Sequence, residues 1–166
     1  MEENKRIEIA FKLLQNVQDL IKFADSKINV LLLISGVTTT FVLSNFHDLY
    51  SLNCLSKIIL GLFFLVFFIF VVFSLKAISP RSDKHSGNTP AKTIYFKHIS
   101  KRIEVKDFID DFNNLTTESC LTDILYQIFE NSKIADKKFK FYSKSLFVLQ
   151  LLIAVFILLI ILKFNS

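Results

Sequence analysis

Charged side chains gather in three groups, and each group lies directly beside a long apolar run of the sequence. If the runs are membrane spans, all three groups fall within about two helical turns of one membrane surface. Ammonium and guanidinium groups gathered in this way can bind a phosphate or a carboxylate. The groups are Asp25 and Lys27 before the first run, Lys76 and Arg81 after the second, and Lys137, Lys138 and Lys144 before the third.

Asp25 is the member of these groups that membrane insertion does not explain. Bases beside a membrane are attracted to anionic lipid by about 1 kcal/mol each, whereas an acid gains nothing there. Lys27 is two residues away and lies on a different face of a helix, so it cannot pair well with Asp25. We therefore expect a base from another helix, such as Arg81, to face Asp25. Either a structural ion pair or contact with an anionic ligand fits these two residues.

A polar stripe marks the last predicted helix. Asp123, Gln127, Asn131 and Lys138 are spaced at i, i+4, i+8 and i+15, which places them close to one side of a helix. The stripe lies beside an apolar seam of the same helix. Gln127 and Lys138 therefore join the candidate binding residues.

The sequence contains no catalytic signature, and we predict that the protein is not an enzyme. His47, His85 and His98 are far apart, and the three glycines form no phosphate-binding loop. No HExxH or CxxC pattern is present, so no metal site is expected. Cys54 and Cys120 fall on opposite sides of the membrane in the topology below, which predicts no disulfide between them.

The apolar runs predict an all-α membrane protein with three transmembrane helices and long cytoplasmic helical extensions. Hydrophobic residues make up 52% of the 166 residues, and three runs approach the roughly 20 residues that cross a bilayer. Five lysines and arginines precede the first run, one lies in the next loop, thirteen lie between the second and third runs, and one follows the third. This distribution places the N-terminus and the middle segment in the cytoplasm, and no cleavable signal peptide is expected. The predicted segments are a cytoplasmic helix 1–27, span 28–46, external loop 47–57, span 58–75, cytoplasmic helical segment 76–145, span 146–162 and external tail 163–166.

Apolar residues at 3-4 spacing predict that helices continue from the cytoplasmic segments into the spans. One helix is expected from about Asn4 to Ser44, because no glycine or proline separates its seam from the first span. Packing within the subunit and pairing with another chain both fit that seam. A second long helix is expected from Glu118 into the third span, after a loop with both prolines and a short helix around 105–115. The first seam is Ile7, Ala10, Leu14, Val17, Ile21, Ala24 and Ile28; the second is Leu121, Leu125, Ile128, Ser132, Ala135, Phe139, Tyr142 and Leu146.

Two of the spans carry residues that suggest particular faces. Small residues of the first span form the pairs Ser35/Thr39 and Gly36/Thr40, a spacing that lets membrane helices approach closely. We interpret this set as a packing face, with a face for oligomers or a pore as the alternative. The phenylalanines of the second span are expected to face lipid; they are Phe63, Phe64, Phe67, Phe68, Phe70 and Phe73.

Four motifs occur in an order that resembles a known family. The motifs are FADSKINVLLLISG before the first span, LKAISPR after the second, IYFKHI, and DILYQIFENSKIADKKFKF before the third. Together they resemble the Pycsar effector transmembrane family of bacterial anti-phage membrane proteins. The resemblance implies an inner-membrane effector that senses cyclic CMP or cyclic UMP, made by a neighbouring pyrimidine cyclase, and impairs the membrane of the infected cell.

Under this resemblance the ligand is a cyclic mononucleotide, with no further cofactor and no nucleic-acid partner. Its phosphate would need a base such as Arg81 or Lys27, and its planar ring an aromatic face such as Tyr95 or Phe96. The expected partners are the lipid bilayer and further copies of the chain. A membrane adaptor that recruits a cytoplasmic protein and a ligand-independent toxin are the alternative functions. The full candidate binding set is Asp25, Lys27, Arg81, Tyr95, Phe96, Gln127 and Lys138.

Overall fold

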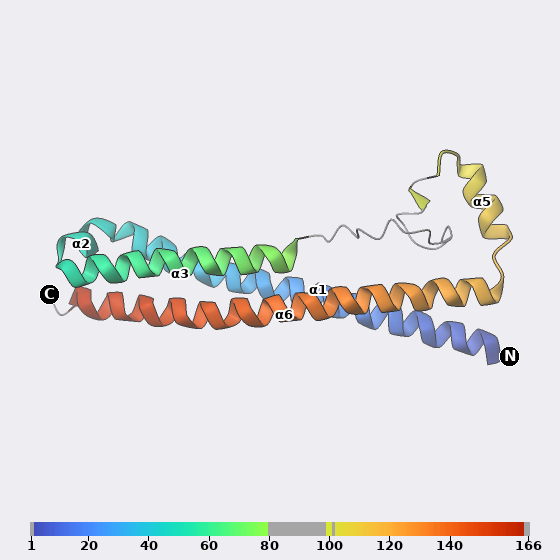
Figure 1. Ribbon diagram of the computed structural model, residues 1–166, viewed down its shortest axis with the longest axis horizontal. Coiled ribbons are helices and arrows are strands. Elements are labelled where there is room, and N and C mark those ends of the chain that lie inside the picture. The colour runs from blue at the N-terminus through green and yellow to red at the C-terminus, as the bar shows by residue number, and fades with distance from the viewer. Residues whose placement is uncertain (1, 80–98, 101, 165–166) are drawn as a thin grey trace. The chain divides into compact units, whose positions relative to one another are not determined.

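The computed structural model describes residues 2–79, 99–100 and 102–164, and its described part contains helices and no strand (Figure 1). The all-α fold class is therefore confirmed. The short helix α2 lies almost wholly in the stretch 47–57, which was predicted as an external loop without a helix. The helices are α1 (Glu2–Ser44), α2 (Phe46–Ser51), α3 (Cys54–Ile78), α5 (Val105–Asn113) and α6 (Thr117–Phe164).

Three helices, α1, α3 and α6, are long and apolar enough to cross a membrane. The chain is thus a multi-pass membrane protein by length and composition. Both α1 and α6 are continuous, as predicted, because neither contains the proline that would break the backbone hydrogen-bond ladder. The bounds of the predicted membrane segments stay predictions, because only the helices themselves are defined.

Local hydrogen bonds mark where several of the helices begin. The Asn53 side chain accepts a hydrogen bond from the Ser56 backbone N–H at 2.8 Å, which caps the start of α3. Helix α5 ends at Asn113, close to the end of the short helix predicted around 105–115. Thr116 and Ser119 then exchange hydrogen bonds at the start of α6, including Ser119 N–H to Thr116 Oγ1 at 3.2 Å. The predicted proline loop from residue 80 onward and the segment 93–98 lie outside the described residues.

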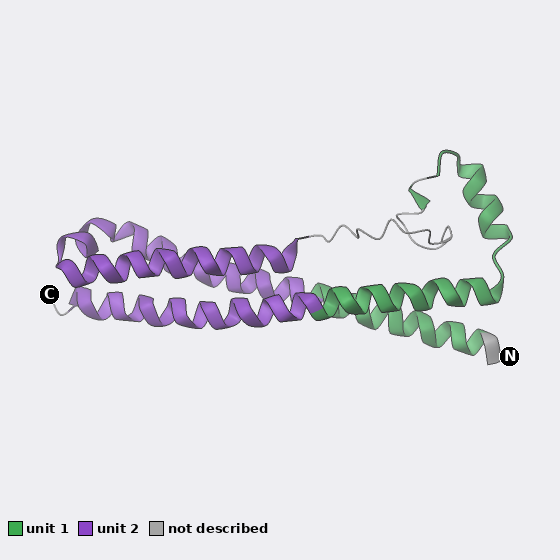
Figure 2. Cartoon of the chain, in the orientation of Figure 1, with its two compact units in different colours: residues 1–22, 80–136 green, residues 23–79, 137–166 purple. Residues whose placement is uncertain are grey.

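The chain divides into two compact units, shown in Figure 2: unit 1 is residues 1–22 and 80–136, and unit 2 is residues 23–79 and 137–166. In unit 1, Ala10 and Leu14 of α1 form a buried cluster with Ile124 of α6. The first predicted seam is thus packed within the subunit at these positions. Partly buried residues surround the cluster; they are Ile7, Cys120, Leu121 and Ile128.

In unit 2, residues of α1, α2, α3 and α6 share one apolar core. On α3, Phe63 and Phe70 are fully buried in it, so the prediction that they face lipid is wrong. Phe68, at 66% exposure, does face outward. The sequence could not separate these positions, because a helix that is apolar on all sides shows no preferred face. The buried positions repeat at 3-4 spacing; they include Ser56, Leu60, Phe63, Phe70, Ser74 and Ala77.

The packing stripe of α6 also differs from the predicted apolar seam. Leu125 is 50% exposed and Ser132 is exposed, whereas Ile124 is fully buried. Of the predicted seam, Ala135 is buried at 7% exposure, and other members pack around the buried clusters. Two residues of the predicted polar stripe are buried as well, Gln127 at 9% and Lys138 at 7% exposure. The buried face of α6 thus combines two neighbouring stripes that both fit a 3-4 repeat, and hydrophobicity alone identified only part of it.

Replacing Ile124 by alanine tests the packing of unit 1. The substitution should leave a cavity and cost about 2–5 kcal/mol, whereas Leu125→Ala removes an exposed side chain and should change little. Cys120 reports the difference, since burial and, secondarily, the charge of Asp123 raise the pKa of its thiol. A raised pKa lowers the thiolate fraction at a given pH, so alkylation of the native protein is slow.

In a Cys54→Ala background, Ile124→Ala should speed iodoacetamide labelling of Cys120 several-fold and move its pH profile downward, because the thiol gains solvent. Leu125→Ala should label at the native rate. Equal rates in both variants would contradict the buried position of Ile124.

Candidate functional site

The Lys138 side chain joins three helices of unit 2. Its Nζ donates a hydrogen bond to the Asp25 carboxylate of α1, with which it forms an ion pair. It also donates to the backbone carbonyl of Ala77 in α3, at 3.1 Å. We call Asp25, Ala77 and Lys138 the three-helix clasp.

The two charges of the clasp differ in their access to solvent. The Lys138 side chain is 9% exposed and the Asp25 side chain is 38% exposed. A buried cation needs a partner, because its desolvation otherwise costs several kcal/mol. An ammonium has three donors, and its hydrogen bonds to the described residues use two of them. The arrangement can therefore accept one more acceptor on the nitrogen, beside an acid that solvent reaches.

Local structure explains why Lys138 reaches this place. The last carbonyls of a helix have no partner within the helix and form the negative end of its dipole. Ala77 lies one residue before the end of α3 at Ile78, so its carbonyl is such an acceptor. Ala77 and Ala24, the residue before Asp25, are 1% and 0% exposed. Small side chains at these two buried positions are compatible with a lysine from α6 beside them.

The structure brings together only part of the candidate binding set. Asp25 faces a base from another helix, as expected, and that base is Lys138. Lys27 is exposed and lies over the Phe23 ring, 5.0 Å from its centroid. Gln127 belongs to unit 1, where it is buried and its Nε2 has no hydrogen-bond partner among the residues that the structure describes. Three further candidates lie outside the described residues; they are Arg81, Tyr95 and Phe96.

The four small residues of the first span divide between two faces. Ser35 and Thr39 are buried, at 2% and 9% exposure, whereas Gly36 and Thr40 are exposed. Ser35 Oγ donates to the Leu32 carbonyl at 2.8 Å and Thr40 Oγ1 to the Gly36 carbonyl at 2.9 Å. These two hydroxyls thus bond to the helix backbone, as expected for polar side chains in lipid, whereas the buried Thr39 Oγ1 has no hydrogen-bond partner among the described residues. Of the two pairs, Gly36/Thr40 is the one that faces outward.

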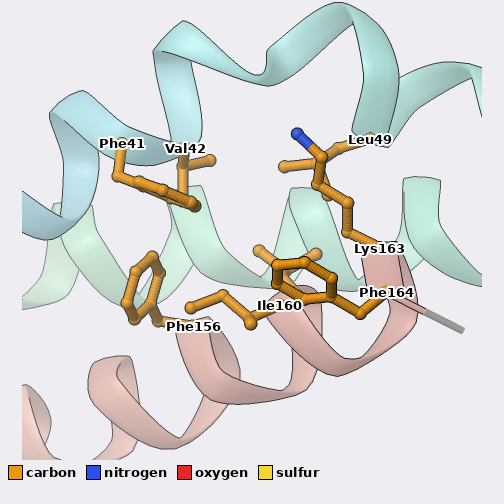
Figure 3. A pocket seen from close by; sticks show the side chains of 8 residues that line it. Phe41, Val42, Leu49, Phe156, Ile160, Lys163 and Phe164 are labelled. Carbon is orange, nitrogen blue, oxygen red and sulfur yellow. The ribbon is translucent and has the colours of Figure 1, made fainter.

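A second ion pair of unit 2 was not predicted. Lys163, which lies in the predicted external tail, donates hydrogen bonds to Asn45 and, at 3.2 Å, to Asp48. Asp48, an acid in the short loop between two spans, is the sequence feature that could have predicted this ion pair. Beside it lies a cavity of about 50 Å³, far smaller than the few hundred Å³ of a typical ligand site. Figure 3 shows its lining residues Phe41, Val42, Leu49, Phe156, Ile160, Lys163 and Phe164; Leu159 completes the lining.

The chemistry that the described residues offer is charge pairing. Within residues 2–79, 99–100 and 102–164, no group of three or more His, Cys, Asp or Glu side chains is placed to hold a metal ion. In the clasp, a buried ammonium is paired with a carboxylate that solvent reaches. Fold and clasp together define a multi-pass helical membrane protein with an ion pair that ties three of its helices.

Comparison with known proteins assigns the family. A family model described as the Pycsar effector protein domain matches residues 9–163. The chain is also 32% identical to the Pycsar effector protein EcPycTM of Escherichia coli, in an alignment of 175 residues that covers 99% of this chain and 94% of that protein. The chain therefore belongs to the Pycsar effector family, and the resemblance seen in its motifs is confirmed. This membership supports a role as an effector of anti-phage defence. No solved structure matches the chain.

The unequal burial of the clasp predicts unequal effects of removing each charge. Asp25→Asn leaves the buried Lys138 without its counter-charge and should destabilise the protein by up to about 3–5 kcal/mol. Lys138→Met leaves only a partly exposed acid and should cost less. The double variant should recover much of the loss, because no unpaired buried cation is left.

Thermal unfolding in detergent measures these differences. Asp19→Asn is the matched control, since Asp19 pairs with Lys22 at 3.1 Å with side chains 69% and 76% exposed. Removing such a surface pair should change stability by less than about 1 kcal/mol. Equal losses for Asp25→Asn and Asp19→Asn would contradict a stabilising clasp.

Proposed function

We propose that this protein is the membrane effector of a Pycsar-like defence system. It responds to cyclic CMP or cyclic UMP, made by a neighbouring pyrimidine cyclase, and impairs the inner membrane so that the infected cell stops phage production. The observation that carries the proposal is the three-helix clasp, because one buried cation ties α1, α3 and α6 of unit 2. With the N-terminus in the cytoplasm, the clasp faces the side on which the nucleotide is made.

The nucleotide acts by competing for the clasp. Its phosphodiester is a monoanion that can accept a charge-assisted hydrogen bond from Lys138 and replace the Asp25 carboxylate. The partial exposure of Asp25 gives the phosphate access to the pair. In this proposal Arg81 and Lys27 add positive charge, and Tyr95 or Phe96 stacks on the pyrimidine ring. The ligand shifts the helices only through its stronger binding to the released arrangement.

Release of the clasp leads to membrane damage through self-association. Helices no longer tied by Lys138 can repack against those of neighbouring copies. The exposed pair Gly36/Thr40 suits such repacking, because small residues let membrane helices approach closely. Several copies together can then form a lesion that depolarises the inner membrane.

A membrane adaptor is the alternative that one observation favours. Helix α5 exposes Val105, Ile109 and Phe112 at 75%, 49% and 57%, which is a face suited to recruiting a protein. An adaptor would retain a stoichiometric partner while the membrane stays intact. A ligand-independent toxin would instead kill on overexpression alone.

Membrane potential in living bacteria tests the proposed function. Cells that express the chain together with a pyrimidine cyclase should lose potential, as reported by a voltage-sensitive dye. Cells with a catalytically inactive cyclase, or with a cyclase that makes cyclic AMP, should keep it. Unchanged potential in the presence of cyclic CMP and cyclic UMP would overturn the proposal.

Variants of the clasp should change this response in different ways. Asp25→Asn removes the acid that the nucleotide displaces, so it should depolarise cells without any cyclase. Lys138→Met removes the cation that binds the phosphate, so its membrane potential should be the same with an active and with an inactive cyclase. Asp19→Asn should respond like the native chain, and Arg81→Ala should insert but respond weakly.

These variants also separate mechanism from folding. Membrane fractionation gives the amount of inserted protein for each variant. A silent Asp25→Asn variant at native abundance would rule out the displacement of Asp25 as the trigger.

A further inference from the structure

Helix α1 carries a second apolar stripe in unit 1, beside the stripe that forms the core. Ala10, Leu14 and Val17 are buried at 4%, 6% and 8% exposure. The residues of the second stripe are shifted by one position, which rotates them by about 100° around the helix. They are exposed large hydrophobic residues: Ile9 at 58%, Leu13 at 46% and Leu20 at 49%.

Lipid does not account for this stripe. Residues 2–22 of α1 contain eight charged side chains, and a segment with that many charges does not lie in the hydrocarbon of a bilayer. Burial of apolar surface contributes about 25 cal/mol of stabilisation for each Å², and side chains left in water do not gain it. Their spacing at 9, 13 and 20, with Asn16 between, is the seven-residue repeat by which helices pair. The stripe therefore has the form of a contact with another helix.

We propose that this stripe pairs with the same stripe of a second copy of this chain, α1 against α1 in parallel. All copies of a multi-pass protein insert in the same direction and at the same depth. A two-fold axis normal to the membrane then brings identical helices together parallel and in register, so one stripe is complementary to itself. A partner protein would have to match both direction and depth independently.

Two further features suit a symmetric pair. Asn16 is the polar position within the stripe, and one amide in an apolar seam typically fixes the register of a parallel helix pair. Residues 2–22 contain four acids and four bases, so two copies side by side carry no net repulsion. The same spacing continues along the α1 sequence through position 27, which is the exposed Lys27; the apolar positions are Phe23, Val30, Ile34 and Val37, each at least 37% exposed.

This inference deepens the self-association included in the proposed function, but its test needs neither nucleotide nor membrane damage. The full chain with Cys54→Ala and Cys120→Ala serves as background, inserted in bacterial membranes without cyclase. Single cysteines are placed at Leu13 and Leu20 on the stripe, and at Phe11 as the control. Phe11 is also apolar and 41% exposed, but lies off the stripe.

Mild oxidation with copper phenanthroline and a non-reducing gel give the result. Leu13→Cys and Leu20→Cys should form disulfide-linked dimers at least five-fold more than Phe11→Cys. No dimer at either stripe position, or equal dimer at all three, would overturn the α1 pairing. Such a failure would leave the depolarisation experiment unaffected, so the two proposals can fail separately.

Substitutions without cysteine chemistry give a second test. Energy transfer between chains carrying donor and acceptor fluorescent proteins should fall by half or more in Leu13→Lys and stay native in Phe11→Lys. Asn16→Leu should raise it, because the seam becomes wholly apolar. Native transfer in Leu13→Lys, or capture of a different protein by a photo-crosslinker at Leu13 in place of a second copy, would overturn the proposal.

Discussion

Unit 2 depends on the pairing of a buried lysine ammonium with groups from two other helices. Lys138 is acceptable there because an acid from α1 and the C-terminal end of α3 both face it. Neither partner alone is enough, since a carbonyl dipole carries only part of a charge and Asp25 is partly hydrated. Removing the acid leaves the cation unpaired. Removing the lysine leaves the Asp25 carboxylate and the Ala77 carbonyl, which can accept hydrogen bonds from water. The stability of unit 2 therefore depends more on Asp25 than on Lys138.

The rest of the packing in unit 2 is consistent with helices that can separate. Small polar residues take buried positions on each long helix; examples are Ser35 on α1, Ser74 on α3 and Ser145 on α6. Among the described residues, Ser74 Oγ and Ser145 Oγ have no hydrogen-bond partner. In lipid, helix association depends on close contact and polar bonds, because the hydrocarbon is as apolar as the side chains. A bundle built this way gains less from staying closed than a fully matched one.

The sequence predicts a structural feature correctly where one physical property of the residues decides it. The lengths of α1 and α6 follow from the absence of helix breakers, and the partner of Asp25 on another helix follows from electrostatics. The prediction fails where several residues share the same property, so that the sequence alone cannot choose between them. Phe63 and Phe68 are equally apolar, and only tertiary packing buries the first. The choice of Lys138 among the juxtamembrane bases likewise depends on where α3 ends.

The two features of α1 suggest why one helix carries both. Asp25 supplies the acidic side of the clasp, and Ile9, Leu13 and Leu20 supply the proposed contact with a second copy. If two copies are paired before any signal, the first clasp to open already has a neighbour against which its helices can repack. The entropic cost of bringing copies together is then met before the nucleotide binds. A small monoanion makes few contacts, so its binding energy is limited. In a pre-formed pair, that energy needs only to displace the Asp25 carboxylate from the Lys138 ammonium.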